Sequence, residues 1–282
     1  MSLLQLFIIA LIQGITEWLP ISSSGHVLLA ADYFALEGRD EYLINAMAHL
    51  GTLGAVLLYF WRDFIRALSG GLTLPYQVLN RAPFTQNQHL AMMILASLPI
   101  TIITILLYEA LLPDTAKDSL RSVWVVGSTS IVFGIALWWA DIKGSQTRSQ
   151  SEMTFVHATL IGATQAIAAL LPGTSRSGIT MTAARALGYS RTESARFSML
   201  IGAPLLAAVG LYAFLQLAGS SEQGIATLTD GIIVAALSFI SGFASIWALM
   251  ALLKRMSFLP FVIYRIVLGV VLLLGAPLIG LI

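Results

Sequence analysis

Six long apolar stretches alternate with short polar segments along the chain. A helix that crosses a membrane needs about 20 mostly apolar residues. The stretches that meet this length are residues 43–61, 89–112, 122–140, 194–218, 230–252 and 258–282. The pattern therefore predicts six transmembrane helices, and with them an all-α polytopic membrane protein that forms a single integral domain over residues 1–282.

Two further apolar regions, residues 3–36 and 155–187, are each interrupted near the middle by a proline and a run of hydroxyl residues. The interruptions read "LPISSSGH" and "LPGTSRSG". Irregular backbone at membrane depth is tolerated only where it is buried in protein or lines a wet cavity. We therefore expect each region to form a re-entrant helical hairpin, which enters and leaves the membrane on one side.

The two breaks align with each other along the chain. Placing Gln13 on Gln165 sets "QGITEWLPISSS" over "QAIAALLPGTSR", with glutamine, proline and serine in register. Each copy precedes three spans, which predicts two repeats, residues 1–141 and 153–282. Because three is odd, the second repeat is inverted relative to the first. Inverted repeats with matching broken helices indicate a site near the bilayer midplane, where the repeats meet.

Lysine and arginine residues in the connecting segments fall mostly on one side of the predicted membrane. That side carries Arg62, Arg66, Arg81, Lys143, Arg148, Arg191, Lys254 and Arg255, and the other side carries Arg39, Lys117 and Arg121. Positive residues concentrate in cytoplasmic loops. Both termini are therefore predicted outside, and the two hairpins approach each other from opposite faces.

Composition narrows the classes of function. Of the 282 residues, 57% are hydrophobic and 10% are charged, and the formal net charge is +1. Such a balance argues against a nucleic-acid partner, which needs a concentrated basic surface. The chain contains no cysteine, which excludes disulfides and thiolate-bound metals.

Both breaks carry groups suited to phosphate chemistry. Gln13 and Glu17 lie four residues apart, on one face of a helix. The first break adds Ser22, Ser23, Ser24, Gly25 and His26, and the second break supplies Thr174, Ser175, Arg176, Ser177 and Thr180. Arginine suits bidentate phosphate binding, and a glycine-rich turn before a helix offers free N–H groups. Glu17 would repel a phosphate unless a metal or a proton intervenes, which favours catalysis over simple binding.

Other interpretations of these residues stay open. Glu17 and His26 could lie at the headgroup interface, with the serines as helix caps. Inverted repeats with broken helices also build transporters, so a carrier of a lipid phosphate or a small anion is the alternative function. Arg265 is as readily explained by snorkelling to the nearer membrane face as by a role in the site. For Arg185 and Arg196, positive-inside anchoring competes with substrate contact.

The motifs "QGITEWLPISSSGH" and "PGTSRSGIT" resemble those of the undecaprenyl-diphosphate phosphatases, the bacitracin-resistance family of bacterial inner membranes. The segments "AHLGTLGAVLLYFW" and "SRTESARFSMLIGAP" add to the resemblance. It implies hydrolysis of undecaprenyl diphosphate to undecaprenyl phosphate and inorganic phosphate, which recycles the lipid carrier for cell-wall synthesis. It also implies a site that opens to the periplasm and a divalent cation, Mg²⁺ or Ca²⁺.

Residue by residue, the resemblance implies site positions at Gln13, Glu17, Ser23, His26, Ser175, Arg176 and Thr180. Gln13 fills a place that is acidic or glutamine in the family, which leaves Glu17 as the single carboxylate. His49 stands where the family more often has glutamine, and we assign it no catalytic role.

The chemistry of these residues suggests their roles. Arg176 is expected to bind the phosphate. Ser23 is the preferred nucleophile, with His26 or Glu17 relaying its proton. A histidine nucleophile and a directly activated water stay open, and Glu17 is a candidate metal ligand. The expected partners are a polyprenyl diphosphate and membrane lipids, and a homodimer is left open.

Overall fold

The computed structural model describes residues 1–23, 25–26, 38–219 and 226–275, and every regular element among them is a helix. The helices of 13 residues or more are α1 (Leu3–Thr16), α3 (Gly38–Tyr59), α4 (Trp61–Leu79), α6 (Pro99–Leu111), α8 (Val123–Lys143), α9 (Phe155–Leu170), α11 (Arg191–Gly219), α12 (Leu228–Leu253) and α13 (Leu259–Gly275). The shorter ones are α5 (Gln86–Ala96), α7 (Asp114–Leu120), a 3₁₀ turn (Gln150–Glu152) and α10 (Arg176–Ala186).

Several of these helices are long and apolar enough to cross a membrane. Four qualify in the described part of the chain: Gln86–Leu111, Val123–Lys143, Arg191–Tyr212 and Leu228–Leu253. The bent pair of α3 and α4 makes a fifth if it counts as one span. Helix α13 is apolar but is described over only 17 residues. The all-helical, multi-pass architecture is confirmed, whereas the described residues do not establish the number of six spans.

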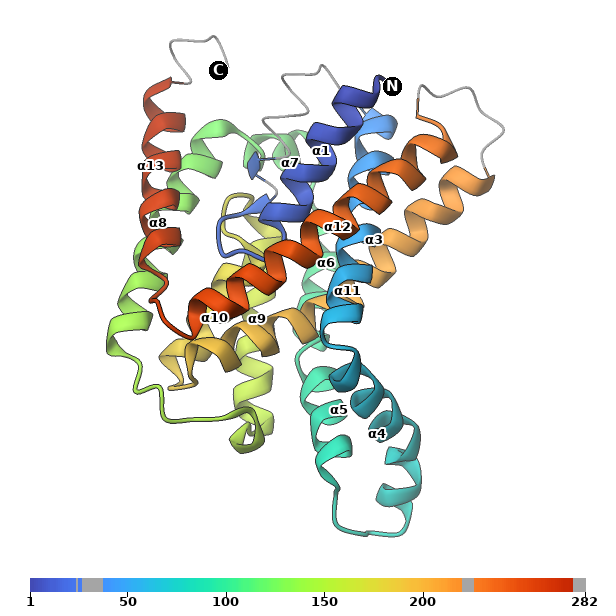
Figure 1. Cartoon of the computed structure of the whole chain (residues 1–282), viewed down its shortest axis with the longest axis vertical. Coiled ribbons are helices and arrows are strands. Elements are labelled where there is room, and N and C mark those ends of the chain that lie inside the picture. Colours follow the sequence, from blue (N-terminus) through green and yellow to red (C-terminus); the bar gives the residue numbers. More distant parts are fainter. Residues whose placement is uncertain (24, 27–37, 220–225, 276–282) are drawn as a thin grey trace.

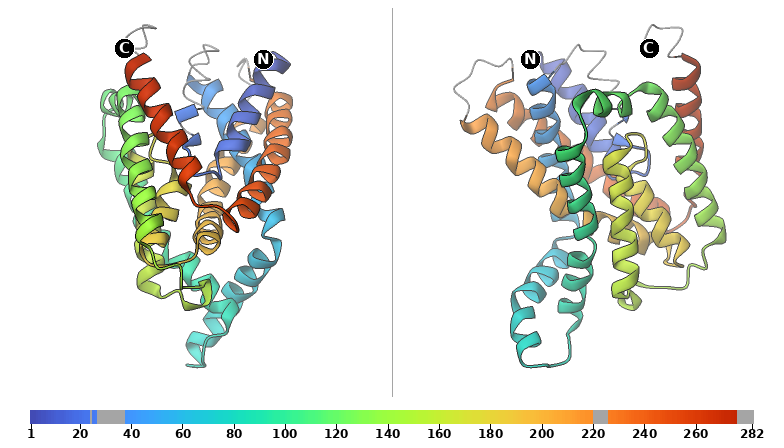
Figure 2. Two further views of the ribbon diagram at one scale, coloured as in Figure 1. Left: turned by 60° about the vertical axis from the view of Figure 1, so that its left-hand side comes forward. Right: turned by 180° about the vertical axis from the view of Figure 1, so that it is seen from behind.

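Helix α4 is an element that the search for long apolar stretches does not predict. It turns by 88° from α3 and pairs with α5, and the two helices project together from one end of the molecule (Figures 1 and 2). Its apolar side chains, including Ile65, Leu68 and Leu72, are exposed along one face. Arg62 and Asp63 interrupt the sequence, so no long apolar run marks this amphipathic helix.

The helices that lead into the two breaks start from opposite ends of the molecule. Helix α1 begins at the end where α13 finishes, whereas α9 begins near the other end, and both run toward the middle (Figures 1 and 2). Helices α9 and α10 pack against each other around the second break. The return limb of the first hairpin falls largely on residues 27–37, which lie outside the described residues.

Close helix packing holds the two breaks in place. Helix α3 packs extensively on α12, α13 on α8, and α1 on α12. Gly14 and Gly51 make these approaches possible, because a Cβ at Gly14 would overlap Ser241 and a Cβ at Gly51 would overlap the carbonyl of Ala235. Small residues allow membrane helices to pack closely without a hydrophobic driving force between them.

Candidate active site

The carboxylate of Glu17 lies at the centre of the polar residues between the two breaks. Glu17 caps the C-terminus of α1 and is buried. Its Oε2 accepts hydrogen bonds from Gln13 Nε2 at 2.8 Å and from Ser23 Oγ at 2.7 Å. Its Oε1 accepts a hydrogen bond from Arg176 Nη2 at 2.7 Å. One carboxylate therefore joins three of the residues that the sequence indicates, and it connects the two breaks directly.

Arg176 is the first residue of α10 and is fixed on three sides. Besides the ion pair with Glu17, its Cζ lies 4.9 Å from the centroid of the buried Trp18 ring, a cation–π contact. On the side of α11, a Cβ at Gly202 would overlap the guanidinium, so this glycine leaves the space that Arg176 occupies. Nη1 is buried and has no hydrogen-bond partner among the described residues. The guanidinium thus keeps one donor group for a ligand.

The turn before α10 leaves further donors unused. Gly173 has φ +85° and Ser175 has φ 67°, and this left-handed backbone leads directly into the helix. The N–H groups of Ser175, Arg176 and Ser177 meet no acceptor in the described parts of the chain. The hydroxyl of Thr174 is buried and equally unpartnered there. Free N–H groups at a helix N-terminus beside an arginine form an anion-binding arrangement.

The other hydroxyls of the second break have protein partners. Ser175 Oγ caps α10 by accepting from the N–H of Gly178 at 3.1 Å. Ser177 Oγ donates to the carbonyl of Leu19 at 2.9 Å and so ties the two breaks together. Thr180 Oγ1 is buried against the carbonyl of Arg176 and against Ser198 Oγ. We expected all three as substrate ligands, and the structure engages all three in holding the turn.

His26 is bonded through both ring nitrogens. Nδ1 lies 2.7 Å from the carbonyl of Ser22, so Nδ1 carries the hydrogen. Nε2 lies 2.5 Å from Tyr264 Oη, and the two rings stack at 5.6 Å. Ser23 donates to Glu17, which makes Glu17 the base that its hydroxyl contacts. Tyr264 is a neighbour that the sequence motifs do not reveal. Ser24, the remaining expected ligand, lies outside the described residues.

Two residues outside the motifs also reach the site. His49, to which we assigned no catalytic role, places Nε2 at 3.5 Å from Glu17 Oε2. Arg265 of α13 is fully buried, and its side chain donates to backbone carbonyls of the two breaks. Snorkelling is therefore the wrong explanation of Arg265. The contacts of His49 and Arg265 join residues that are distant in sequence, so no local sequence pattern predicts them.

The remaining charged candidates form ion pairs with other protein residues. Arg185 donates to Asp141 Oδ1 at 3.0 Å, and Arg196 pairs with Asp63. Neither contact involves the breaks, so the structure gives no support to substrate contact by Arg185 or Arg196. Lys117 of α7 lies 2.8 Å from Glu109 near the end of α6, and this hydrogen bond raises the pKa of the Lys117 ammonium.

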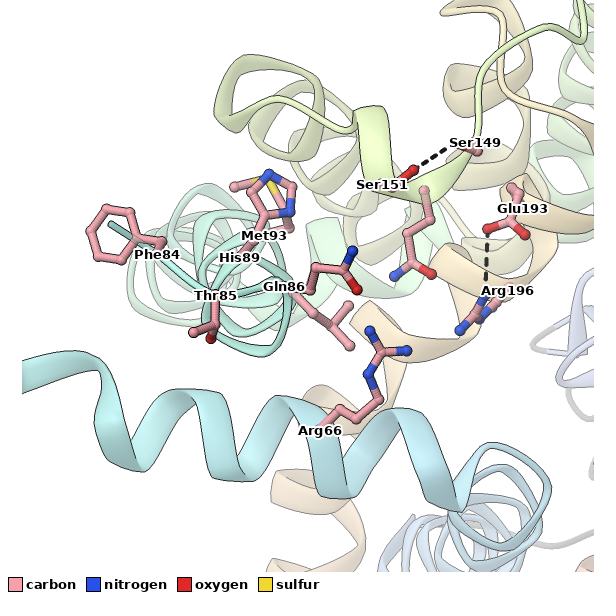
Figure 3. A pocket seen from close by; sticks show the side chains of 12 residues that line it. Arg66, Phe84, Thr85, Gln86, His89, Met93, Ser149, Ser151, Glu193 and Arg196 are labelled. Carbon is pink, nitrogen blue, oxygen red and sulfur yellow. Dashed lines mark hydrogen bonds and ion pairs between the residues drawn. The ribbon is translucent and has the colours of Figure 1, made fainter. Parts of the chain in front are cut away.

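A separate cleft of about 470 Å³ opens between α4, α5, residues 149–151 and the start of α11 (Figure 3). Arg66, Arg196 and Glu193 face it from two sides. Its charges are matched within the protein, because Arg196 pairs with Asp63 and lies 3.7 Å from Glu193, and Arg66 lies 3.9 Å from Asp63. None of its lining residues belongs to either break, so the cleft is distinct from the candidate active site.

The described residues around Glu17 offer few ligands for a metal ion. Among the described residues no group of three or more histidine, aspartate or glutamate side chains is placed to hold an ion. Both oxygens of Glu17 already accept hydrogen bonds. The described residues therefore offer one carboxylate and no closed cage, so a hard cation there would depend on oxygens of the substrate and of water.

The chain is similar to known proteins over almost its whole length. The model of the family described as bacitracin resistance protein BacA matches residues 6–271. An undecaprenyl-diphosphatase of Hyphomonas neptunium is 56% identical over 281 residues, which cover 99% of each chain. Proteins with the same name from Ruegeria pomeroyi and Jannaschia sp. are 45% and 42% identical, and each match covers at least 97% of both chains.

Proposed function

Because the chain belongs to the bacitracin resistance protein BacA family, we propose that it hydrolyses undecaprenyl diphosphate to undecaprenyl phosphate and inorganic phosphate. The names of its relatives, at identities up to 56% over 99% of the chain, support this substrate. One observation carries the proposal: Glu17 binds the hydroxyl of Ser23 with one oxygen and the guanidinium of Arg176 with the other. The carboxylate of Glu17, as the base, thus contacts both the nucleophile and the group that binds the anion.

In the proposed reaction, the terminal phosphoryl group binds to Arg176, to the free N–H groups at the start of α10 and to the hydroxyl of Thr174. Ser23 Oγ attacks the terminal phosphorus while Glu17 Oε2 accepts the hydroxyl proton. The bond from that phosphorus to the bridging oxygen breaks, and undecaprenyl phosphate leaves. Glu17 gives that proton to the leaving phosphate and is again a base. Water then attacks the phosphoserine, Glu17 accepts a proton from the water and returns it to Ser23 Oγ as the phosphorus–Oγ bond breaks, and inorganic phosphate is released. Positioning and charge neutralisation supply most of the rate in such transfers.

The choice of Ser23 over His26 follows from their partners. Ser23 has the carboxylate within 2.7 Å, whereas both nitrogens of His26 are occupied by Ser22 and Tyr264. We assign His26 to orienting the first break and the substrate beside it. A directly activated water is the competing mechanism, and trapping of a phosphoserine at Ser23 during turnover would decide against it.

The proposal includes a divalent cation, Mg²⁺ or Ca²⁺, that binds together with the diphosphate. Glu17 is the residue that would hold it, and phosphate oxygens and water would supply its other ligands. When bound, the cation would neutralise part of the phosphate charge.

We further propose six membrane spans and two re-entrant hairpins in two inverted repeats, in a bacterial inner membrane. Both termini and the opening of the site would face the periplasm. The start of α1 and the end of α13 lie at one end of the molecule, which supports a common side for the termini (Figure 1). A homodimer stays a prediction.

The test is phosphate release by the purified full-length chain in liposomes that contain undecaprenyl diphosphate, with Mg²⁺ or Ca²⁺ present. We expect stoichiometric inorganic phosphate, abolished in Arg176→Gln. If the wild type releases no phosphate and instead moves the lipid or an anion across the bilayer, the chain is a transporter and the proposal is wrong.

A further inference from the structure

We propose that Arg265 is a positioning residue for the phosphate site, which holds the backbone of both breaks so that N–H groups are free for the substrate. The inference rests on the proposed function and extends it to a residue of α13, far from both motifs in sequence. Arg265 has no contact with the substrate in this proposal. It acts through the peptide groups of the two breaks.

In the described structure the Arg265 side chain donates only to backbone carbonyls, which belong to the two breaks and to Thr129 and Ser130 of α8. Nη2 donates to the carbonyls of Gly173 at 3.0 Å and Thr174 at 2.8 Å, the two residues that precede the Ser175 cap. Nη1 lies 3.4 Å from the carbonyl of Pro20 in the first break. Nε donates to the carbonyl of Ser130 in α8 at 3.2 Å. One planar side chain therefore joins both breaks to α8.

The direction of these carbonyls fixes the direction of the donors. A trans peptide bond is planar, so its C=O and N–H point in opposite directions. Because the carbonyl of Thr174 points at Arg265, the N–H of Ser175 points away from it. This N–H is one of the three at the start of α10 that meet no acceptor in the described chain. Arg265 thus selects the orientation of a peptide group that the substrate would use.

The positive charge of Arg265 also favours a bound phosphate. Its side chain is fully buried, and among the described residues it forms no ion pair with a carboxylate. The charge of Arg176, in contrast, is matched by Glu17 at 2.7 Å. A buried cation that is bonded only to neutral carbonyls is costly at membrane depth. An anion at the breaks would lower that cost, so Arg265 also contributes attraction for a phosphate.

The surrounding helices are shaped to admit this guanidinium. A Cβ at Gly178 in α10 would lie 2.8 Å from Arg265 Nη1. A Cβ at Gly134 in α8 would lie 3.3 Å from Arg265 Cβ and 3.8 Å from Nε. A larger residue at Gly178 would push the guanidinium away from the carbonyls that it holds, and one at Gly134 would press on the base of the Arg265 side chain.

Arg185 offers a matched control within the same chain. It is fully buried like Arg265, and it also donates to backbone carbonyls, those of Asp141 at 2.8 Å and Tyr189 at 2.5 Å. It belongs to the end of α10 away from the break. Arg185→Lys therefore removes a buried guanidinium with a similar set of hydrogen bonds, but it does not alter the residues that present N–H groups to the substrate.

The experiment compares Arg265→Lys and Arg185→Lys in full-length protein reconstituted with undecaprenyl diphosphate. Lysine keeps the charge but lacks the planar fork that holds two adjacent carbonyls. We expect Arg265→Lys to raise both KM and the inhibition constant of inorganic phosphate about tenfold, since small misplacements of binding groups have large effects. Arg185→Lys should lower Tm and leave both constants within about twofold of wild type. Equal constants in the two variants would overturn the inference.

Two further variants distinguish a loss of folding and a failure of the proposed function from a failure of this inference. If Arg265→Lys does not fold, Gly134→Ala crowds Arg265 while keeping it, and we expect the phosphate inhibition constant to rise about threefold. An unchanged constant in folded Gly134→Ala would then overturn the inference. Arg176→Gln separates this inference from the proposed function: if its activity is normal, the proposed site is wrong. If it is inactive while Arg265→Lys is normal, only the role of Arg265 is wrong.

Discussion

At the scale of single residues, Glu17 determines how the site is organised. Three donors from two distant segments converge on its carboxylate, and His49 lies 3.5 Å away. Spacing alone explains one of these contacts, since residues four apart on a helix face each other and Gln13 does bond to Glu17. The others depend on how the two breaks are brought together.

Glu17→Gln should reduce the rate of phosphate release at saturating substrate by about a hundredfold or more, because the amide cannot take the proton of Ser23. Initial rates in reconstituted liposomes measure this. The matched control is Glu109→Gln, an exposed carboxylate paired with Lys117, which should keep the wild-type rate. A Glu17→Gln enzyme with more than a tenth of wild-type activity would remove Glu17 from its role as the base.

Gly202→Ala should reduce kcat/KM about tenfold or more, because the added Cβ occupies the space of the Arg176 guanidinium. The obstructed group is the end of a flexible side chain, so the arginine should move while the helix stays in place, and Tm should change little. Gly242→Ala is the control, since a Cβ there meets its neighbours at ordinary contact distances of 3.4 Å or more. Equal activity of the two variants would show that Arg176 tolerates displacement.

At the scale of elements, the features that could be predicted are those that a local pattern marks, namely the long apolar helices and the two breaks. The breaks at Pro20 and Pro172 stand out because polar residues interrupt apolar runs. Helix α4 is not predicted because its arginines and aspartate interrupt the long apolar run that marks a membrane span, although the helix is amphipathic. The contacts of Arg265 and His49 could not be predicted, since they depend on which helices pack together, and one sequence does not contain that information.

The ends of four helices meet at Asp141 of α8. Its Oδ1 accepts from Arg185 Nε at 3.0 Å and Arg191 Nε at 2.8 Å, and its Oδ2 accepts from the N–H of Phe258 at 3.1 Å. Because the carboxylate is buried, removing its charge lowers the stability of the protein more than removing one partner of an exposed ion pair would. This cluster holds α8, α10, α11 and the residue before α13 in place, away from the breaks.

Asp141→Asn should destabilise the protein by about 3 kcal/mol, because a buried arginine loses its counter-charge. We expect a lower Tm in detergent and an unchanged KM for the protein that stays folded. Asp118→Asn, at an exposed position of α7, is the control and should leave Tm unchanged. A large rise in KM for folded Asp141→Asn would mean that this cluster also shapes the site.

At the scale of the whole molecule, the direction in which the chain inserts decides where the site opens. Helix α8 has Asp118 before its start and Thr147 after its end, both exposed. The distribution of lysine and arginine predicts the first outside and the second inside.

Single cysteines at Asp118 and Thr147 test this directly, because the natural chain has none. A membrane-impermeant thiol reagent applied to intact spheroplasts should label Asp118→Cys, and should label Thr147→Cys only after permeabilisation. The opposite pattern would place the termini in the cytoplasm and would reverse the side from which the lipid enters.

The ion pair between Arg176 and Glu17 has a consequence for turnover. A phosphate that binds fully to Arg176 competes with a carboxylate that already lies 2.7 Å from it. When the product is present, Glu17 acts as an internal competitor that is always at high effective concentration. Such competition limits the affinity for inorganic phosphate and shortens its residence time, so the protein would be protected from inhibition by its own product.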